Sequence, residues 1–284
     1  AVSALLAFAG AFACVRLLLS RFGAFTLDQP NERSLHERPV PRTGGIAILA
    51  GSVTAFAFGV SALWLPIALA VALAAISLVD DVVGLPPLAR LAGHVLAATV
   101  LAWYLLAPIH PVLFLILVLA VAWMTNAYNF MDGSDGLAGG MSVIGFGAYA
   151  LAAQLAGATA LATFGVALAA ASCAFLFSNF HPARIFMGDV GSIPLGFLAG
   201  ALGIIGWHES AWGPAFPILV FSPFVADATL TLMRRLLRRE KLWQAHREHY
   251  YQRLVLMGLG HRGVALVAYA VMLTVAATAF LVRE

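Results

Sequence analysis

Residues 64–81 read WLPIALAVALAAISLVDD, and this stretch decides the fold. Residues 64–79 carry no charge, and their length approaches the roughly 20 apolar residues that cross a bilayer as a helix. The stretch then ends on two adjacent acids, Asp80 and Asp81. A carboxylate beside hydrocarbon is unfavourable unless it faces a wet cavity or has a partner. The stretch therefore predicts a membrane helix with a polar site at its end.

Runs of the same kind fill the chain of 284 residues, which is 62% hydrophobic and 10% charged. Soluble domains are about 45–50% apolar, so the composition indicates an integral membrane protein. The runs are continuous and rich in Ala and Leu, whereas a membrane β-barrel needs alternating segments. We predict an all-α integral membrane protein, a single polytopic membrane domain over 1–284 with about ten transmembrane helices. The predicted spans are 1–20, 44–61, 64–80, 91–107, 111–127, 138–154, 159–178, 191–206, 214–233 and 263–281.

Basic residues gather on one side of these spans. With ten spans, the loop 21–43 shares its side with 81–90, 128–137, 179–190 and 234–262. Of the 16 Lys and Arg residues, all except Arg283 lie on that side or at its edge. The positive-inside rule makes that side cytoplasmic and places both termini outside. The acidic motifs then share the cytoplasmic face, as an active site would require.

The first motif is the acid pair Asp80-Asp81 at the end of the third span. Two adjacent negative charges near a low dielectric repel each other unless a cation neutralises them, so the pair is a candidate base or cation-facing site. The alternative is an ordinary solvated helix end, because Gly84, Pro86 and Pro87 break the helix there. Acids at a helix C-terminus also oppose the helix dipole, which favours the functional interpretation.

The second motif, residues 126–136, reads NAYNFMDGSDG. Its polar residues Asn126, Asn129, Asp132 and Asp135 recur every three positions, and the glycines after the acids allow a tight turn. Carboxylate and amide oxygens suit a hard cation such as Mg²⁺, which binds one or two protein ligands together with phosphate. The alternative is a glycine-rich capping turn. Four spaced polar residues exceed what capping needs and favour a site.

The third motif, residues 178–192, reads SNFHPARIFMGDVGS. Asp189 suits a cation, Arg184 suits phosphate, and Phe186 suits a flat base. The alternatives are an N-cap at Asp189 for the next span and a membrane anchor at Phe186.

The fourth motif is the basic loop 234–262, interpreted as a cytoplasmic substrate-recognition loop. His246, His249 and Arg253 lie three and four residues apart, so one helical face would present all three to a phosphate. A basic helix on anionic lipid is the alternative for the start of the loop, and a softer metal is a weaker one for the histidines.

Two further features are less specific. Gly44-Gly45 opens the second span and is compatible with an anion site at free N–H groups, or with a plain tight helix start. Asp227 lies within the span 214–233 and needs a partner or a groove, structural or functional.

Four stretches together resemble the polyprenyl-phosphate N-acetylhexosamine-1-phosphate transferase family, of the glycosyltransferase family 4 type. They are residues 38–45, Asp80-Asp81, 126–136 and 186–192. Their order and their places at span ends are specific, and the resemblance covers roughly residues 28–255. Several members carry His-x-His-His in the recognition loop, whereas residues 249–252 read HYYQ here. That form is similar to the O-antigen initiator branch, so UDP-MurNAc-pentapeptide is not the expected donor.

The resemblance implies roles for individual residues, around a cytoplasmic-side catalytic cleft. It implies Mg²⁺, with Mn²⁺ as an alternative, at Asp189 and Asn129. The implied catalytic residues are Asp80, Asp81, Asp132 and Asp189. The implied nucleotide contacts are Asn126, Asp132, Asp135, Asn179 and Phe186. The implied sugar or phosphate contacts are Arg42, His246, His249 and Arg253.

The implied reaction moves a sugar 1-phosphate from a UDP-N-acetylamino sugar to polyprenyl (undecaprenyl) phosphate and releases UMP. Such an enzyme would lie in a bacterial inner membrane and serve cell-surface polysaccharide synthesis. We expect the nucleotide sugar, the lipid phosphate and the membrane as partners, with no nucleic acid; a homodimer is compatible with the sequence. One alternative is a secondary transporter, which predicts mid-span acids and internal repeats. The other, suggested by Gly188-Asp189, is an intramembrane aspartyl protease, which needs two acids that face each other.

Overall fold

The computed structural model describes residues 1–22, 27–28, 39–106, 110–241 and 246–283. Arg33 and Arg38 of the predicted basic side, and residues 242–245 of the predicted recognition loop, lie outside the described residues. The helices are α1 Val2–Leu17, α2 Gly44–Val53, α3 Trp64–Val83, α4 Pro87–Leu106, α5 Pro111–Phe130, α6 Leu137–Ala156, α7 Thr159–Asn179, α8 Asp189–His208, α9 Ala215–Val220, α10 Ser222–Leu237, α11 Tyr250–Leu254 and α12 Gly260–Leu281.

Short turns and one small ladder complete the described structure. A π turn at Leu18–Phe22 extends α1, and 3-10 turns follow α2 at Thr54–Phe58 and precede α3 at Ser61–Leu63. A π turn at Val255–Leu259 joins α11 to α12. The two-residue strands β1 Leu27–Asp28 and β2 Val40–Pro41 pair antiparallel, with Leu27 opposite Pro41.

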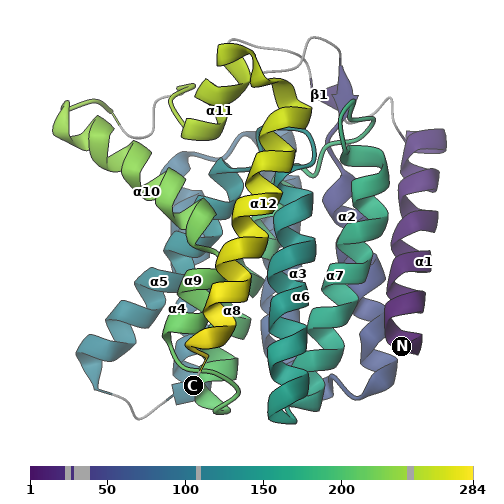
Figure 1. Ribbon diagram of the computed structural model, residues 1–284, viewed down its shortest axis with the longest axis vertical. Helices are drawn as coiled ribbons and strands as arrows, with labels where there is room; N and C mark the ends of the chain where they lie inside the picture. The colour runs from purple at the N-terminus through teal and green to yellow at the C-terminus, as the bar shows by residue number, and fades with distance from the viewer. Residues whose placement is uncertain (23–26, 29–38, 107–109, 242–245, 284) are drawn as a thin grey trace.

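Eight helical segments of the described chain are long and apolar enough to cross a membrane, and Gly44–Phe58 is a shorter apolar one. This confirms the all-α membrane fold. The predicted run 214–233 is not one span, because the chain breaks at Phe221, just before Pro223, and forms α9 and α10. Proline suits the first turn of a new helix but not the interior of a continuing one. Figure 1 shows α10 leaving the bundle at an angle.

Helix α8 is the most buried of the eight segments. It packs against α5 and α3 and also contacts α2. A side chain added at Gly196 would meet Tyr128 and Met124 of α5, so the two backbones approach closely there. Small residues allow such contact between membrane helices, where packing replaces the hydrophobic effect. The N-terminus of α8 is thereby fixed beside the C-terminus of α5.

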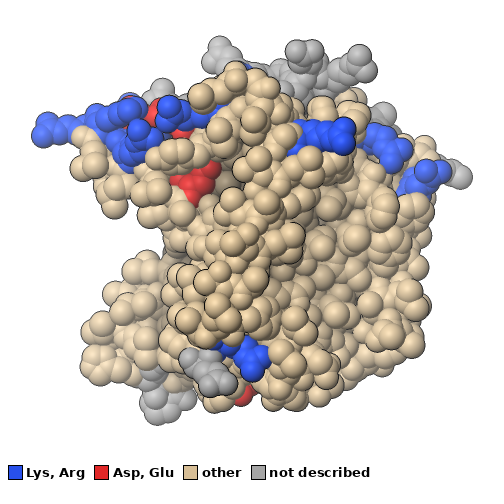
Figure 2. Space-filling model, in the orientation of Figure 1, with Lys and Arg blue, Asp and Glu red and all other residues tan. Residues whose placement is uncertain are grey.

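The two ends of the bundle differ in character. Figure 1 places both chain termini at one end and β1 and α11 at the other. In the view of Figure 2, Lys and Arg side chains gather around the β1 and α11 end, with few near the termini. The motifs described next belong to the ends of helices that meet at this charged end.

Candidate active site

Four carboxylates from three parts of the chain form an acid cluster: Asp80, Asp81, Asp132 and Asp189. The pair at the end of α3 acts electrostatically on Asp189, the first residue of α8. Asp189 in turn acts on Asp132, in the loop between α5 and α6. The structure therefore brings together all four predicted catalytic residues.

Two arginines hold this cluster together. Arg90, near the start of α4, lies with its Nη1 3.2 Å from Asp80 Oδ2 and 3.9 Å from Asp189 Oδ2. Arg42 pairs with Asp81 at 3.0 Å. The other oxygen of Asp80 accepts the Leu85 amide at 2.6 Å, just after α3 ends. These contacts fix the acids of α3 relative to α8.

The surroundings of Asp132 strongly favour its protonated form. Desolvation raises the pKa of its carboxyl well above the ordinary value, and the charge of Asp189 raises it further. A hydrogen bond from the Gly188 backbone opposes this shift. The ionised form of Asp132 is therefore held in an unfavourable electrostatic environment that a cation would relieve.

Asn129 joins the end of α5 to the first turn of α8. Its Oδ1 accepts a hydrogen bond from Ser192 Oγ at 2.6 Å, three residues after Asp189. The Asp132 amide donates to the Asn129 carbonyl at 3.2 Å. The two predicted metal ligands, Asn129 and Asp189, thus belong to directly bonded helix ends.

The expected free N–H groups at Gly44-Gly45 are not free. The Gly44 amide donates to the Phe186 carbonyl at 2.9 Å, and the Gly45 amide donates to the Met187 carbonyl at 2.9 Å. The Phe186 amide donates to the Pro41 carbonyl at 2.7 Å. The anion-site interpretation is wrong there, because the start of α2 holds the loop that leads into Asp189.

Two predicted nucleotide contacts take part in a neighbouring network of loop contacts. Asp135 Oδ2 accepts His181 Nδ1 at 2.7 Å and the Ala183 amide at 3.1 Å. Asn179 accepts the Gly136 amide and donates to the Ile185 carbonyl, both at 3.0 Å. Both side chains are buried. They bind the loop after α5 to the loop before α8, which carries the half-buried Phe186.

Asn126 lies one turn deeper on α5 than Asn129. Its Nδ2 donates to the Ala122 carbonyl at 2.7 Å, and the side chain also hydrogen-bonds His94 of α4. These contacts join α4 to α5. They do not link Asn126 to the acid cluster, and its nucleotide contact stays a prediction.

The histidines of the recognition loop do not lie on one helical face with Arg253. The helix α11 begins at Tyr250, with His249 as its N-cap and His246 outside it. His249 is buried, with its ring centroid 5.0 Å from that of His246, whereas Arg253 is exposed. The expected common face is wrong, because an N-cap residue does not have helical backbone angles.

The sequence interpretation missed the role of one residue, Arg90, and one pairing, that of Asp227 with His249. Arg90 is the only Lys or Arg between residues 43 and 183, and that isolation in an apolar stretch was a usable signal. The partner of Asp227 was not named; it is His249, with Nδ1 to Oδ1 at 3.0 Å. Asp227, Thr231 and Arg235 recur every four residues, a spacing that places them on one helical face.

Comparison with known proteins gives the family. Residues 63–207 match the profile of glycosyl transferase family 4. The chain is 31% identical to the probable undecaprenyl-phosphate N-acetylglucosaminyl 1-phosphate transferase of Bacillus subtilis (strain 168), over 90% of this chain and 76% of the relative. This chain belongs to glycosyl transferase family 4. The resemblance inferred from the motifs is confirmed.

Two further relatives carry names of the same kind. The decaprenyl-phosphate N-acetylglucosaminephosphotransferase of Mycobacterium tuberculosis (strain ATCC 25618 / H37Rv) is 33% identical, over 90% of this chain and 74% of the relative. The phospho-N-acetylmuramoyl-pentapeptide-transferase of Symbiobacterium thermophilum is 52% identical, but over only 33% of this chain and 28% of the relative. The transporter and protease alternatives receive no support, and the O-antigen branch stays a prediction.

Proposed function

We propose that this chain transfers N-acetylglucosamine 1-phosphate, or the 1-phosphate of a related N-acetylamino sugar, from a UDP-sugar to polyprenyl phosphate. An oxygen of the lipid phosphate bonds to the β-phosphorus, the bond from that phosphorus to the bridging oxygen breaks, and UMP leaves. The observation that carries the proposal is the acid cluster, gathered from three parts of the chain at the end of a membrane bundle. Relatives named for such transfers support it.

The donor set of the cluster fits a magnesium ion. Magnesium in phosphoryl-transfer sites uses one or two carboxylates, with substrate phosphates and water completing the shell. Among the described residues, no group of three His, Cys, Asp or Glu side chains could hold a metal alone. Asp189 and Asn129 would therefore hold it together with the substrate. When bound, it would neutralise charge on the diphosphate.

The remaining residues would position the two substrates. Phosphoryl transfer asks a protein mainly for alignment and charge compensation. Arg42 and the acid pair it joins, Asp80-Asp81, would orient the lipid phosphate. Asp132 and Phe186, in the two loops beside the first turn of α8, would contact the nucleotide. His246, His249 and Arg253 would contact the sugar or its phosphate.

The lipid would reach the cluster from the side. Figure 2 shows a hollow beneath the arm formed by α10. That helix exposes apolar side chains, among them Leu230, Met233 and Leu237. Apolar exposure of this kind suits contact with acyl or prenyl chains. The excess of basic residues at the site end supports a cytoplasmic orientation by the positive-inside rule.

The test is a transfer assay on purified protein. The protein is incubated with polyprenyl phosphate and one UDP-sugar at a time, with Mg²⁺ or with EDTA, and products are identified by mass spectrometry. The donors are UDP-N-acetylglucosamine, UDP-N-acetylgalactosamine, UDP-glucose and UDP-MurNAc-pentapeptide. We expect polyprenyl-diphospho-N-acetylglucosamine and UMP in equal amounts, only with the metal.

Two matched variants of α8 locate the activity. Asp189→Asn removes the charge at the site end, and Glu209→Gln removes one at the cap of the opposite end. We expect loss of transfer in the first and wild-type transfer in the second. Failure of every donor to yield a lipid diphosphosugar would refute the function. Activity that survives both EDTA and Asp189→Asn would refute the metal role alone.

A further inference from the structure

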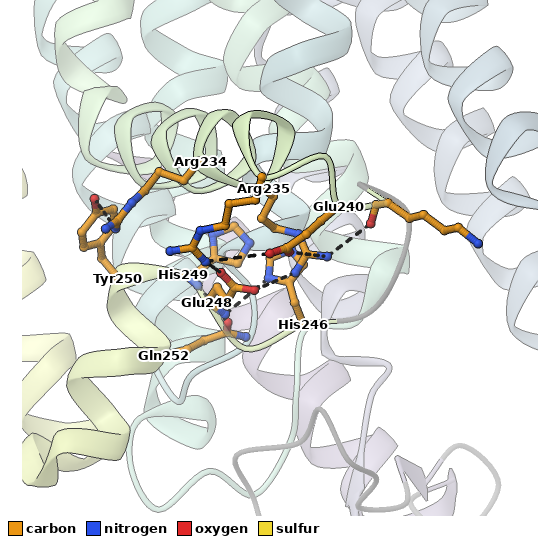
Figure 3. Close-up of polar contacts among 10 residues, drawn as sticks. Arg234, Arg235, Glu240, His246, Glu248, His249, Tyr250 and Gln252 are labelled. Atoms are coloured by element: carbon orange, nitrogen blue, oxygen red, sulfur yellow. Dashed lines mark hydrogen bonds and ion pairs between the residues drawn. The ribbon is translucent and has the colours of Figure 1, made fainter.

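Helix α10 buries a polar face. Asp227, Thr231 and Arg235 are 9%, 2% and 4% exposed, and their four-residue spacing places them in one row. Buried polar side chains are unfavourable unless they are hydrogen-bonded. Figure 3 shows what lies beside Arg235: Glu240, Glu248 and His249 face this part of α10. The row therefore binds the recognition loop to α10.

Asp227 is the centre of this contact. Its Oδ1 accepts from His249 Nδ1 at 3.0 Å, from the Tyr250 amide at 3.0 Å and from Thr231 Oγ1 at 3.2 Å. Its Oδ2 accepts the Tyr251 amide at 3.0 Å. The two amides belong to the first turn of α11, so Asp227 caps that helix from a neighbouring one. A carboxylate that accepts from all these donors requires Nδ1 to carry the histidine proton.

A second contact fixes the residue next to His249. Arg235 Nη1 donates to Glu248 Oε1 at 3.0 Å, and its Nη2 donates to the Lys241 carbonyl at 3.2 Å. Arg235 also pairs with Glu240 at 3.4 Å (Figure 3). These contacts of Arg235 hold the backbone next to His249 in place independently of Asp227.

The His249 ring is also held by its neighbours. It stacks on Phe130, at the end of α5, with centroids 5.9 Å apart and planes 29° apart. Tyr251 stacks on it at 5.8 Å, and the Tyr251 hydroxyl donates to the Phe130 carbonyl at 3.1 Å. The ring therefore lies between α10 and the residue that precedes the 131–136 loop. With Nδ1 committed to Asp227, Nε2 is the nitrogen left for a ligand.

We propose that Asp227 is a positioning residue, which fixes His249 as the Nδ1–H tautomer so that the Nε2 lone pair accepts a hydrogen bond from a hydroxyl or the acetamido N–H of the donor sugar. This rests on the proposed function, in which His249 contacts the donor. Outer partners of this kind set the tautomer and orientation of a histidine in many sites. The lipid acceptor does not depend on this contact.

The decisive variant is Asp227→Asn. The asparagine oxygen still accepts from a backbone amide, but its NH₂ group now donates to Nδ1, which moves the histidine proton to Nε2. We expect kcat/KM for UDP-N-acetylglucosamine to fall about ten- to a hundred-fold, as outer-partner losses usually do. KM for polyprenyl phosphate should stay unchanged. The control Thr231→Val removes another hydrogen bond to the same oxygen and should keep wild-type kinetics.

A double-mutant cycle separates positioning from simple destabilisation. If Asp227 acts through His249, adding Asp227→Asn to His249→Gln should cause no further loss of kcat/KM. Losses that multiply, or equal effects of Asp227→Asn and Thr231→Val, would overturn the proposal.

A measurement without substrate separates this proposal from the proposed function. Nitrogen-15 NMR of histidine-labelled wild-type protein, with His249 assigned through His249→Gln, reports which ring nitrogen carries the proton. We expect it on Nδ1 in the wild type and on Nε2 in Asp227→Asn. A wild-type proton on Nε2 would overturn the proposal even if the asparagine variant does not fold. An inactive wild type with the proton on Nδ1 would refute the function and uphold the tautomer assignment.

Discussion

The contact between α2 and α8 tests whether helix packing controls the position of Asp189 in the acid cluster. Gly45, at the start of α2, faces Gly191 in the first turn of α8. A Cβ added at Gly45 would lie 2.1 Å from the Gly191 Cα, 2.4 Å from its nitrogen and 3.0 Å from the Met187 carbonyl oxygen. All three atoms belong to backbone, so no side-chain rotation can relieve the clash. The perturbation is Gly45→Ala.

The size of the effect follows from these distances. Carbon atoms rest at about 3.5–4.0 Å, so the two backbones would have to separate by roughly 1.5 Å. The Gly44 and Gly45 amides resist this, because each is bonded at 2.9 Å to the loop before Asp189. Overpacking of this kind costs about 1–3 kcal/mol. At about 2–4 °C for each kcal/mol, Tm should fall by roughly 2–12 °C.

Activity should fall further than stability suggests. The strained loop ends at Asp189, and a displacement of about 1 Å in a catalytic group can reduce the rate a hundred-fold. The assay is thermal unfolding in detergent together with lipid-diphosphosugar formation. The control is Gly147→Ala on α6, where an added Cβ meets nothing within 4 Å. Wild-type Tm and activity in Gly45→Ala would refute the packing argument, and a lowered Tm with wild-type activity would refute its link to the site.

Two further predictions concern the loops around the acid cluster. In EDTA, Asp132→Asn should raise Tm relative to wild type by an amount that grows with pH. The folded pKa of Asp132 is raised, so wild type loses stability as pH rises from the ordinary value through the folded one, whereas the asparagine variant does not. A Tm difference that is constant or shrinks with rising pH would contradict this. Asn179→Asp should lower stability by about 1–3 kcal/mol, because the Ile185 carbonyl loses its donor; unchanged chemical denaturation would contradict it.

The sequence predicted the spans well where hydrophobic length alone decides them. It failed at 214–233, where a run of suitable length and composition is divided at Phe221 and continues as a helix with a buried polar face. Nothing in hydrophobicity distinguishes a lipid-facing helix from one that is covered by a distant loop. The four-residue spacing of Asp227, Thr231 and Arg235 carried that information, but only the fold shows what covers the row.

The sequence predicted which residues gather at the site better than it predicted which side chains pair with one another. Each acidic motif lies at the end of a helix. Successive membrane helices alternate in direction, which brings such ends to the same side of the bundle. The convergence of Asp80, Asp132 and Asp189 therefore followed from the topology. Pairing did not follow, because it depends on side chains from other segments. Arg90 lies ten residues from Asp80 and ninety-nine from Asp189 in the sequence, yet it contacts both.

Local electrostatics gives an independent reason to regard this cluster as a site. The acids at the C-terminal end of α3 oppose its dipole, and Arg90 near the N-terminal end of α4 opposes the dipole of that helix. Each placement is unfavourable alone, and each is compensated by the other through the contact at 3.2 Å between Arg90 and Asp80. A helix end selected for stability alone would carry the opposite charges. Residues that break local rules in a mutually compensating way are typical of functional sites. On this argument, exchanging the charges of Arg90 and Asp80 would improve both helix ends and still abolish transfer.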